Sequence, residues 1–301
     1  MGRLFRLVSC TFALCVAVGG STVFATSPIP EPVERSLPGS ESRYATVDGI
    51  RVHYESYGKG RDALVFVHGW TCDTTFWQEQ RLGFERKSRV ILVDLPGHGL
   101  SERPQVSYTM DLFARAVEAL LRDAGVDRAV LIGHSMGTPV IRQFYRRYPS
   151  KTRALVIVDG PLRPFADEAV MERFIAPLRG ANYQDAASQL IDGMLGPQVS
   201  PALRERIKSA MLKTPQYVAV SAMEGMAAPE IWSQDKINVP VLAILAKSPF
   251  WPADNEKFFR EIAADLDYQM WEGVSHFLMM EKPQEFNETV AAFLTKKGLL
   301  K

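Results

Sequence analysis

The feature of this sequence that most restricts its fold is a series of short apolar runs that do not alternate with polar residues. Runs of four or five residues rich in Val and Ile are typical of strands buried on both faces of a parallel sheet. Helical patterns separate them, for example over residues 112–121, where one face is apolar and the opposite face charged. Strands that alternate with helices predict right-handed crossovers and a doubly wound, mostly parallel α/β sheet. The runs are Ala63–Val67, Val90–Val93, Ala129–Ile132, Ala154–Val158 and Val241–Leu245.

Two further patterns bring the expected sheet to eight strands. Residues 45–55 alternate apolar and polar side chains around Asp48-Gly49, the strongest short-range signal for a β-hairpin. We expect this hairpin to form an antiparallel pair at one edge of the sheet. Residues Tyr268–Trp271 give the last strand, and Phe286–Leu294 give a closing helix after Pro283.

Between the sixth and seventh strands the chain shows helical patterns and no strand-like run. A compact domain rarely contains an unstructured loop of this length, so the segment predicts a helical cap inserted after the sixth strand. We place the cap at residues 162–236 and the core at residues 43–161 and 237–301. The helical patterns cover residues 170–178, 183–195, 202–212 and 217–226.

The N-terminus has the three parts of an export signal. Arg3 and Arg6 precede the apolar stretch Leu7–Val18, and Val23-Phe24-Ala25 forms a small-residue cleavage site. Residues 1–25 therefore predict a signal peptide, the proline-rich residues 26–42 an extended leader, and the location a secreted or periplasmic one. A retained membrane anchor is the alternative, but the apolar stretch is shorter than the roughly 20 residues that a span needs.

The composition, with 47% hydrophobic and 23% charged residues, is that of a soluble globular protein. Residues 1–25 hold two arginines and no acid, so their removal changes the formal charge from +1 to −1. This balance gives no reason to expect a nucleic-acid partner. No other stretch predicts stable membrane insertion after signal cleavage. Two of the three cysteines lie in the signal, so Cys72 has no partner for a disulfide within the mature chain.

The segment Gly133-His-Ser135-Met-Gly137 follows a predicted strand and precedes a predicted helix. A serine on a sharp turn between strand and helix projects its hydroxyl above the sheet, and the flanking glycines relieve crowding. Ser135 is therefore the predicted nucleophile. The start of the helix places the Met136 amide where an oxyanion would develop.

A serine hydroxyl needs a neighbouring base to accept its proton, and the sequence has five histidines. His276 follows the last predicted strand in a short loop, so it can reach the same end of the sheet as Ser135. The other four lie in the hairpin, in two glycine-bearing loops and beside the serine, at His53, His68, His98 and His134. We therefore predict His276 as the general base.

Together these motifs resemble the α/β-hydrolase fold family, specifically its capped esterase and lipase-like members, over nearly the whole mature chain. The resemblance implies that the loop after the third strand supplies a second oxyanion donor, for which the Trp70 amide is the candidate. It also implies that Asp94 and His98 are structural, and it implies no cofactor and no metal ion. The matching segments are His68-Gly69, Asp94–Ser101, the Ser135 turn and Gly273-Val-Ser-His276-Phe277.

The third member of the expected site is an aspartate that orients the histidine, and here the sequence departs from the family pattern. Family members usually place an aspartate shortly after the strand that follows the cap, where this chain has Ala246-Lys-Ser-Pro249 and no carboxylate. Asp159, at the end of the sixth strand, and Asp254, a few residues beyond the usual position, are the two substitutes. Each has an ordinary structural explanation, because Asp159 precedes a Gly-Pro turn and Asp254 suits a helix N-cap. We favour Asp159.

These residues predict a serine hydrolase that cleaves an ester or lactone of a small, largely apolar substrate through an acyl-Ser135 intermediate. An amide or peptide hydrolase of the proline iminopeptidase-like type is one alternative. A binding protein on a decayed hydrolase scaffold is the other, supported only by the missing carboxylate. Epoxide hydrolases and haloalkane dehalogenases of this fold use an aspartate at the nucleophile position, so Ser135 argues against both.

Overall fold

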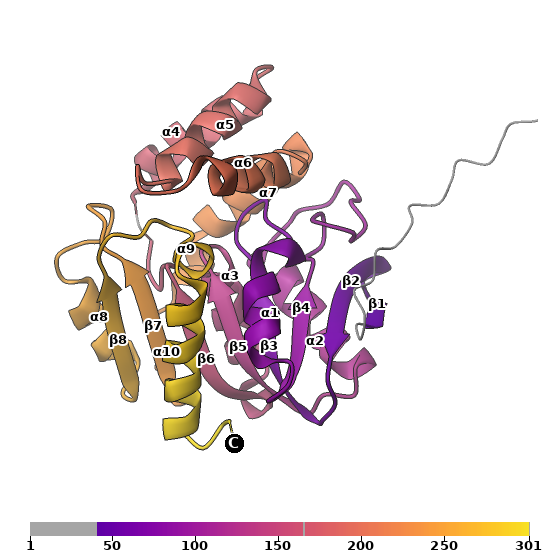
Figure 1. Cartoon of the computed structure of the whole chain (residues 1–301). Coiled ribbons are helices and arrows are strands. Elements are labelled where there is room, and N and C mark those ends of the chain that lie inside the picture. Colours follow the sequence, from indigo (N-terminus) through magenta and orange to yellow (C-terminus); the bar gives the residue numbers. More distant parts are fainter. Residues whose placement is uncertain (1–40, 165, 301) are drawn as a thin grey trace, which may run out of the picture. The chain divides into compact units, whose positions relative to one another are not determined.

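The computed structural model describes residues 41–164 and 166–300, which form an eight-stranded sheet with helices on both faces (Figure 1). The strand order is β1-β2-β4-β3-β5-β6-β7-β8, in which β2 is antiparallel to both of its neighbours and all later neighbours are parallel. The doubly wound, mostly parallel sheet predicted from the apolar runs is therefore confirmed. The strands are β1 (Glu41–Val47), β2 (Ile50–Tyr57), β3 (Asp62–Val67), β4 (Arg89–Val93), β5 (Arg128–His134), β6 (Thr152–Val158), β7 (Val241–Ala246) and β8 (Leu266–Trp271).

The hairpin of β1 and β2 lies at one edge of the sheet, as expected. Its two turn residues have positive φ, +49° at Asp48 and +82° at Gly49, which is the backbone that a two-residue type I′ turn requires. Strand β1 begins at Glu41, so the last two residues of the segment predicted as a leader belong to the sheet. The predicted signal peptide and the rest of the leader lie outside the described residues.

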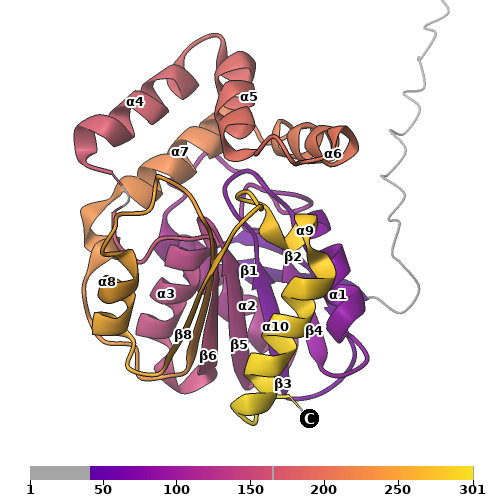
Figure 2. The ribbon, with the colours of Figure 1, turned by 60° about the vertical axis from the view of Figure 1, so that its left-hand side comes forward.

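Helices pack on both faces of the central strands, which are buried almost throughout. Helices α1 (Gln78–Phe84) and α10 (Pro283–Lys296) cover one face, and α2 (Met110–Asp123), α3 (Gly137–Arg147) and α8 (Asn255–Ile262) cover the other (Figure 2). The short helix α9 (Leu278–Glu281) connects the loop after β8 to α10. This arrangement leaves the two ends of the sheet for loops and insertions.

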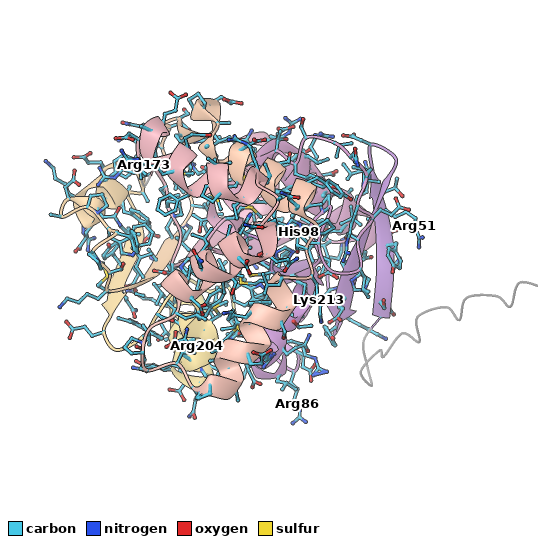
Figure 3. The ribbon with its side chains drawn as sticks, turned by 90° about the horizontal axis from the view of Figure 1, so that it is seen from above. Arg51, Arg86, His98, Arg173, Arg204 and Lys213 are labelled. Carbon is cyan, nitrogen blue, oxygen red and sulfur yellow. The ribbon has the colours of Figure 1, made fainter. Side chains whose placement is uncertain are left out.

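Among the described residues, four α-helices lie between β6 and β7 and form the cap, so the predicted insertion after the sixth strand is confirmed. They are α4 (Glu168–Arg179), α5 (Tyr183–Met194), α6 (Pro201–Met211) and α7 (Gln216–Ala227), and they stand beyond the carboxyl ends of the parallel strands (Figure 1). The view from above shows the cap helices lying across this end of the sheet, with the labelled His98 near the middle of the view (Figure 3). None of the helices in the described part of the chain is long and apolar enough to cross a membrane.

Candidate active site

Ser135 lies in a tight turn between β5 and α3. Its φ is +52°, in the left-handed region that costs a residue with a side chain about 1–2 kcal/mol. A Cβ on Gly133 would lie 2.5 Å from the Gly137 carbonyl oxygen, and one on Gly137 would lie 2.4 Å from the Val67 carbonyl oxygen. Only glycine fits at these two positions, which explains the spacing of the motif. The turn is also tied to β6, because the Ser135 amide donates to the Val158 carbonyl at 2.9 Å.

Asp159 directly follows β6, the strand beside β5. Its backbone is also left-handed, with φ of +42°, a region that aspartate tolerates better than most residues. Its Oδ1 accepts a hydrogen bond from the Ala246 amide at the end of β7, at 2.8 Å. Its Oδ2 lies 2.6 Å from Nδ1 of His276. The carboxylate is therefore held between the end of β7 and the loop after β8.

His276 lies in the loop between β8 and α9. With Asp159 ionised, the carboxylate only accepts, so the bond at 2.6 Å places a proton on Nδ1 and leaves Nε2 able to accept another. The His276 side chain is 20% exposed and that of Asp159 only 6%. The ring of His134, the residue before Ser135, lies with its centroid 4.7 Å from that of His276. The structure therefore brings the predicted nucleophile, base and favoured acid to one end of the sheet.

Asp254 is not part of this group. It occupies the N-cap position of α8, as the sequence suggested, but its side chain makes no capping hydrogen bond with that helix. Its exposed carboxylate instead pairs with Arg163, whose hydrogen bonds hold the pKa of Asp254 below its usual range. No hydrogen bond in the described part of the chain joins Asp254 to His276. Asp159 is therefore the one of the two candidates that contacts the histidine.

The Met136 and Trp70 amides both belong to residues close to Ser135. Met136 follows it in sequence, and Trp70 follows Gly69, on which a Cβ would stand 3.1 Å from the Ser135 Cβ. Within residues 41–164 and 166–300, neither amide donates a hydrogen bond. Buried amides without an acceptor are rare, since each costs about 1–3 kcal/mol. Both amides are therefore available to donate to the oxygen of a bound acyl group.

Burial lowers the pKa of three other histidines, His68, His98 and His134, to about 3 for His98. Because His134 is neutral and its Nε2 lies 2.8 Å from the His276 carbonyl oxygen, Nε2 carries the proton and donates. This bond ties the Ser135 turn to the His276 loop. His68 lies with its ring centroid 5.1 Å from that of His98, inside the core.

A second hydrogen-bonded Ser–His–Asp chain lies toward the edge strands β1 and β2. Ser42 Oγ lies 2.9 Å from His53 Nε2, and His53 Nδ1 lies 2.7 Å from Asp94. The Asp94 carboxylate also accepts from the Thr74 and Leu100 amides. Both His53 and Asp94 are 1% exposed, and Ser42 lies within strand β1 with no strand-to-helix turn beside it. This chain therefore joins β1, β2 and the loop after β4 as a structural network.

Cys72 is buried, as the sequence predicted. Burial raises the pKa of its thiol, and Sγ donates to the Trp70 carbonyl at 3.4 Å. A thiol in this environment is a poor nucleophile.

Contacts between the cap and the site were not predicted. The His276 amide donates to the Met194 carbonyl at the end of α5, at 3.3 Å, and the Trp70 indole donates to the Ala219 carbonyl in α7, at 2.8 Å. Because every residue has a carbonyl, no residue type could have revealed these two acceptors. The Thr214 hydroxyl donates to the Thr71 carbonyl at 3.2 Å, and a threonine between two helices is no signal by itself.

Comparison with known proteins agrees with this geometry. The model of the alpha/beta hydrolase family matches residues 64–289. The chain is 26% identical to 3-oxoadipate enol-lactonase 2 of Acinetobacter baylyi, covering 83% of this chain and 96% of that one. It is 30% identical to a non-heme chloroperoxidase of Streptomyces lividans, with 83% and 98% covered. A solved esterase from Thermogutta terrifontis is 25% identical with a TM-score of 0.76, covering 85% of this chain and 99% of the esterase. The chain therefore belongs to the alpha/beta hydrolase family.

Proposed function

We propose that this protein hydrolyses carboxylic esters or lactones of small, largely apolar molecules through an acyl intermediate on Ser135. The observation that carries the proposal is the bond of 2.6 Å between His276 and Asp159, at the same end of the sheet as the strained Ser135 turn. The enol-lactonase and the esterase among the relatives support an ester or lactone as the bond that is cleaved.

In the first half of the reaction, the Ser135 Oγ attacks the carbonyl carbon while His276 Nε2 accepts the hydroxyl proton. The Asp159 carboxylate stabilises the imidazolium that forms and does not itself take the proton. The Trp70 and Met136 amides donate to the oxyanion. His276 then gives its proton to the departing alkoxide, which leaves the acyl group on Ser135.

In the second half, His276 accepts a proton from water, the resulting hydroxide attacks the acyl carbon, and the proton returns to the Ser135 Oγ. The Ser135 hydroxyl makes no hydrogen bond within the described part of the chain. Catalytic hydrogen bonds are often long before substrate binds, so we expect the bond to His276 to form in the complex.

The alternative of a binding protein on a decayed hydrolase scaffold rested on the absence of an acid for the site. The sequence lacks a carboxylate after the cap, but Asp159 lies against His276 from the neighbouring strand. An amide substrate would need the same attack, and no described group near Ser135 favours it over an ester. We therefore retain ester or lactone hydrolysis as the proposed reaction.

Labelling with a fluorophosphonate probe, combined with turnover of p-nitrophenyl esters and lactones of increasing acyl length, tests the proposal. Ser135→Ala should lose the label and reduce kcat by roughly a millionfold, as removal of the serine does in a well-studied protease. Ser209→Ala, the same substitution on the exposed face of α6, should keep both the label and the parental kcat. Turnover by Ser135→Ala within tenfold of the parent enzyme would disprove the assignment of the nucleophile.

A further inference from the structure

The loop that carries the Trp70 amide, residues 68–72, has a backbone that must be held in place by its surroundings. Thr71 has φ of +56°, and a β-branched residue is a genuine outlier in this region. Such conformations persist only where neighbouring groups determine them. Thr71 is 2% exposed and Trp70 3%, so water does not supply those groups. We call residues 68–72 the oxyanion loop.

Three hydrogen bonds hold the oxyanion loop through its peptide groups. The Thr214 hydroxyl, in the cap, donates to the Thr71 carbonyl at 3.2 Å. The Cys72 amide donates to the Gly69 carbonyl at 3.2 Å. The Gly69 carbonyl also accepts from Nδ1 of His68 at 2.8 Å.

These bonds form a continuous chain, because each peptide group contains one carbonyl and the amide of the next residue in one plane. The Thr71 carbonyl and the Cys72 amide belong to one peptide group. The Gly69 carbonyl and the Trp70 amide belong to another. The chain therefore runs from the Thr214 hydroxyl through both peptide groups and ends at the Trp70 amide. In a trans peptide the amide points away from its carbonyl, so the direction in which Gly69 O is held fixes the direction of the Trp70 N–H.

We propose that Thr214 is a positioning residue that orients and polarises the Trp70 amide through this chain. Hydrogen bonds in series polarise one another, and the effect is strongest where water is excluded. Thr214 is 4% exposed and lies between α6 and α7, where the labelled neighbour Lys213 marks the segment over the core (Figure 3). The cap thus acts on the oxyanion site through this chain of hydrogen bonds, which begins at the Thr214 hydroxyl.

This inference rests on the proposed function, because it gives the Trp70 amide a role in the transition state. The indole of Trp70 supports the same arrangement from the other side, since its Nε1 donates to the Ala219 carbonyl at 2.8 Å. The loop is therefore attached to the cap on both sides of the Trp70–Thr71 bond. A change in the cap at Thr214 should alter catalysis more than substrate binding.

The test replaces Thr214 by Val, which has the same shape without the hydroxyl, and by Ser, which keeps the donor. We expect Thr214→Val to lower kcat and the rate of fluorophosphonate labelling roughly tenfold, below the 10²–10³ that follows removal of a whole oxyanion donor. The KM and the pH dependence of kcat should stay unchanged, and Thr214→Ser should restore most of the rate. The final extent of fluorophosphonate labelling gives the amount of folded, active enzyme, and kcat is calculated from that amount. If the Val variant does not fold, Thr214→Ala replaces it.

Tyr183→Phe provides a matched control. The Tyr183 hydroxyl donates to the Thr214 carbonyl at 3.1 Å, so its removal also deletes a buried hydrogen bond of the cap but leaves the chain to Trp70 intact. This variant should lower thermal stability and keep kcat. Equal losses of kcat in Tyr183→Phe and Thr214→Val, or a parental labelling rate in Thr214→Val, would overturn the inference. The proposed function would still stand in either case if the label were found on Ser135.

Discussion

Replacing Asp159 by Asn tests the orientation of His276 with little change in shape. The Asn oxygen can keep the hydrogen bond from the Ala246 amide, and Asn tolerates the φ of +42° as Asp does. Its NH₂ group would then face Nδ1 of His276, where a carboxylate oxygen lies at 2.6 Å. A donor at that position requires Nδ1 without a proton, so the proton moves to Nε2. Nε2 is the atom that must accept the proton of Ser135, and it is blocked in this tautomer.

We expect kcat to fall about ten-thousandfold, the effect of this substitution in a well-studied serine protease. That factor corresponds to about 5.5 kcal/mol of activation free energy. Loss of the charge-assisted hydrogen bond accounts for about 1.5–3 kcal/mol, and the wrong tautomer accounts for the rest. The KM and the melting temperature should change little, because the Asn side chain fills the space of the Asp159 side chain.

The assay is turnover of a p-nitrophenyl ester by the purified protein, with Asp254→Asn as the matched control. Asp254 is exposed and pairs with Arg163 at the surface. The kcat of Asp254→Asn should therefore stay within about twofold of the parent value. A loss of less than tenfold from Asp159→Asn, or a larger loss from Asp254→Asn, would refute the role given to Asp159.

Four further outcomes are expected. Burial lowers the pKa of His98 to about 3, so below pH 6.5 the unfolded chain binds a proton that the folded chain does not; melting temperatures measured from pH 7 to pH 4 should therefore fall, and a constant value would contradict this. A thiol reagent should leave Cys72 unmodified in native protein and label it after unfolding, because Cys72 is 1% exposed and burial raises its pKa. Gly160→Ala would place a Cβ 1.9 Å from Thr138 Oγ1, so the free energy of unfolding should drop by about 1–3 kcal/mol in denaturant titrations. Protein from a secreting host should begin near Thr26 by intact mass, and an N-terminus at Met1 would contradict the predicted signal peptide.

The sheet could be predicted from the sequence because its physical requirements are local. A strand segment buried on both faces must be apolar at consecutive positions, and each of β3 to β7 contains such a run, four or five residues long and without a helix period. The Asp48-Gly49 turn could be predicted for the same reason, since its two positive φ values are available to few residue pairs. The cap was predicted by exclusion, because a long segment without strands must form some structure of its own.

The roles within the site could be predicted only in part. Ser135 stood out because its strained turn requires glycines at fixed distances on both sides, and these appear in the sequence. The sequence favoured Asp159 over Asp254 only by weighing their ordinary structural explanations, because both residues follow strands whose carboxyl ends lie at the same end of the sheet. Thr214 could not be recognised, because its contribution depends on a backbone carbonyl of Thr71, more than a hundred residues earlier.

The strand order explains how the carboxylate can come from β6 and still reach a histidine that follows β8. Val158, the last residue of β6, pairs with Ile244, so β7 continues for two residues beyond β6, as far as Ala246. The Ala246 amide thereby reaches past the end of β6 and donates to Asp159 Oδ1. The end of β7 supplies a backbone donor in the region where the family pattern places an aspartate. With that donor on Oδ1, the second oxygen of Asp159 meets Nδ1 of His276, so a carboxylate that follows β6 reaches a histidine that follows β8.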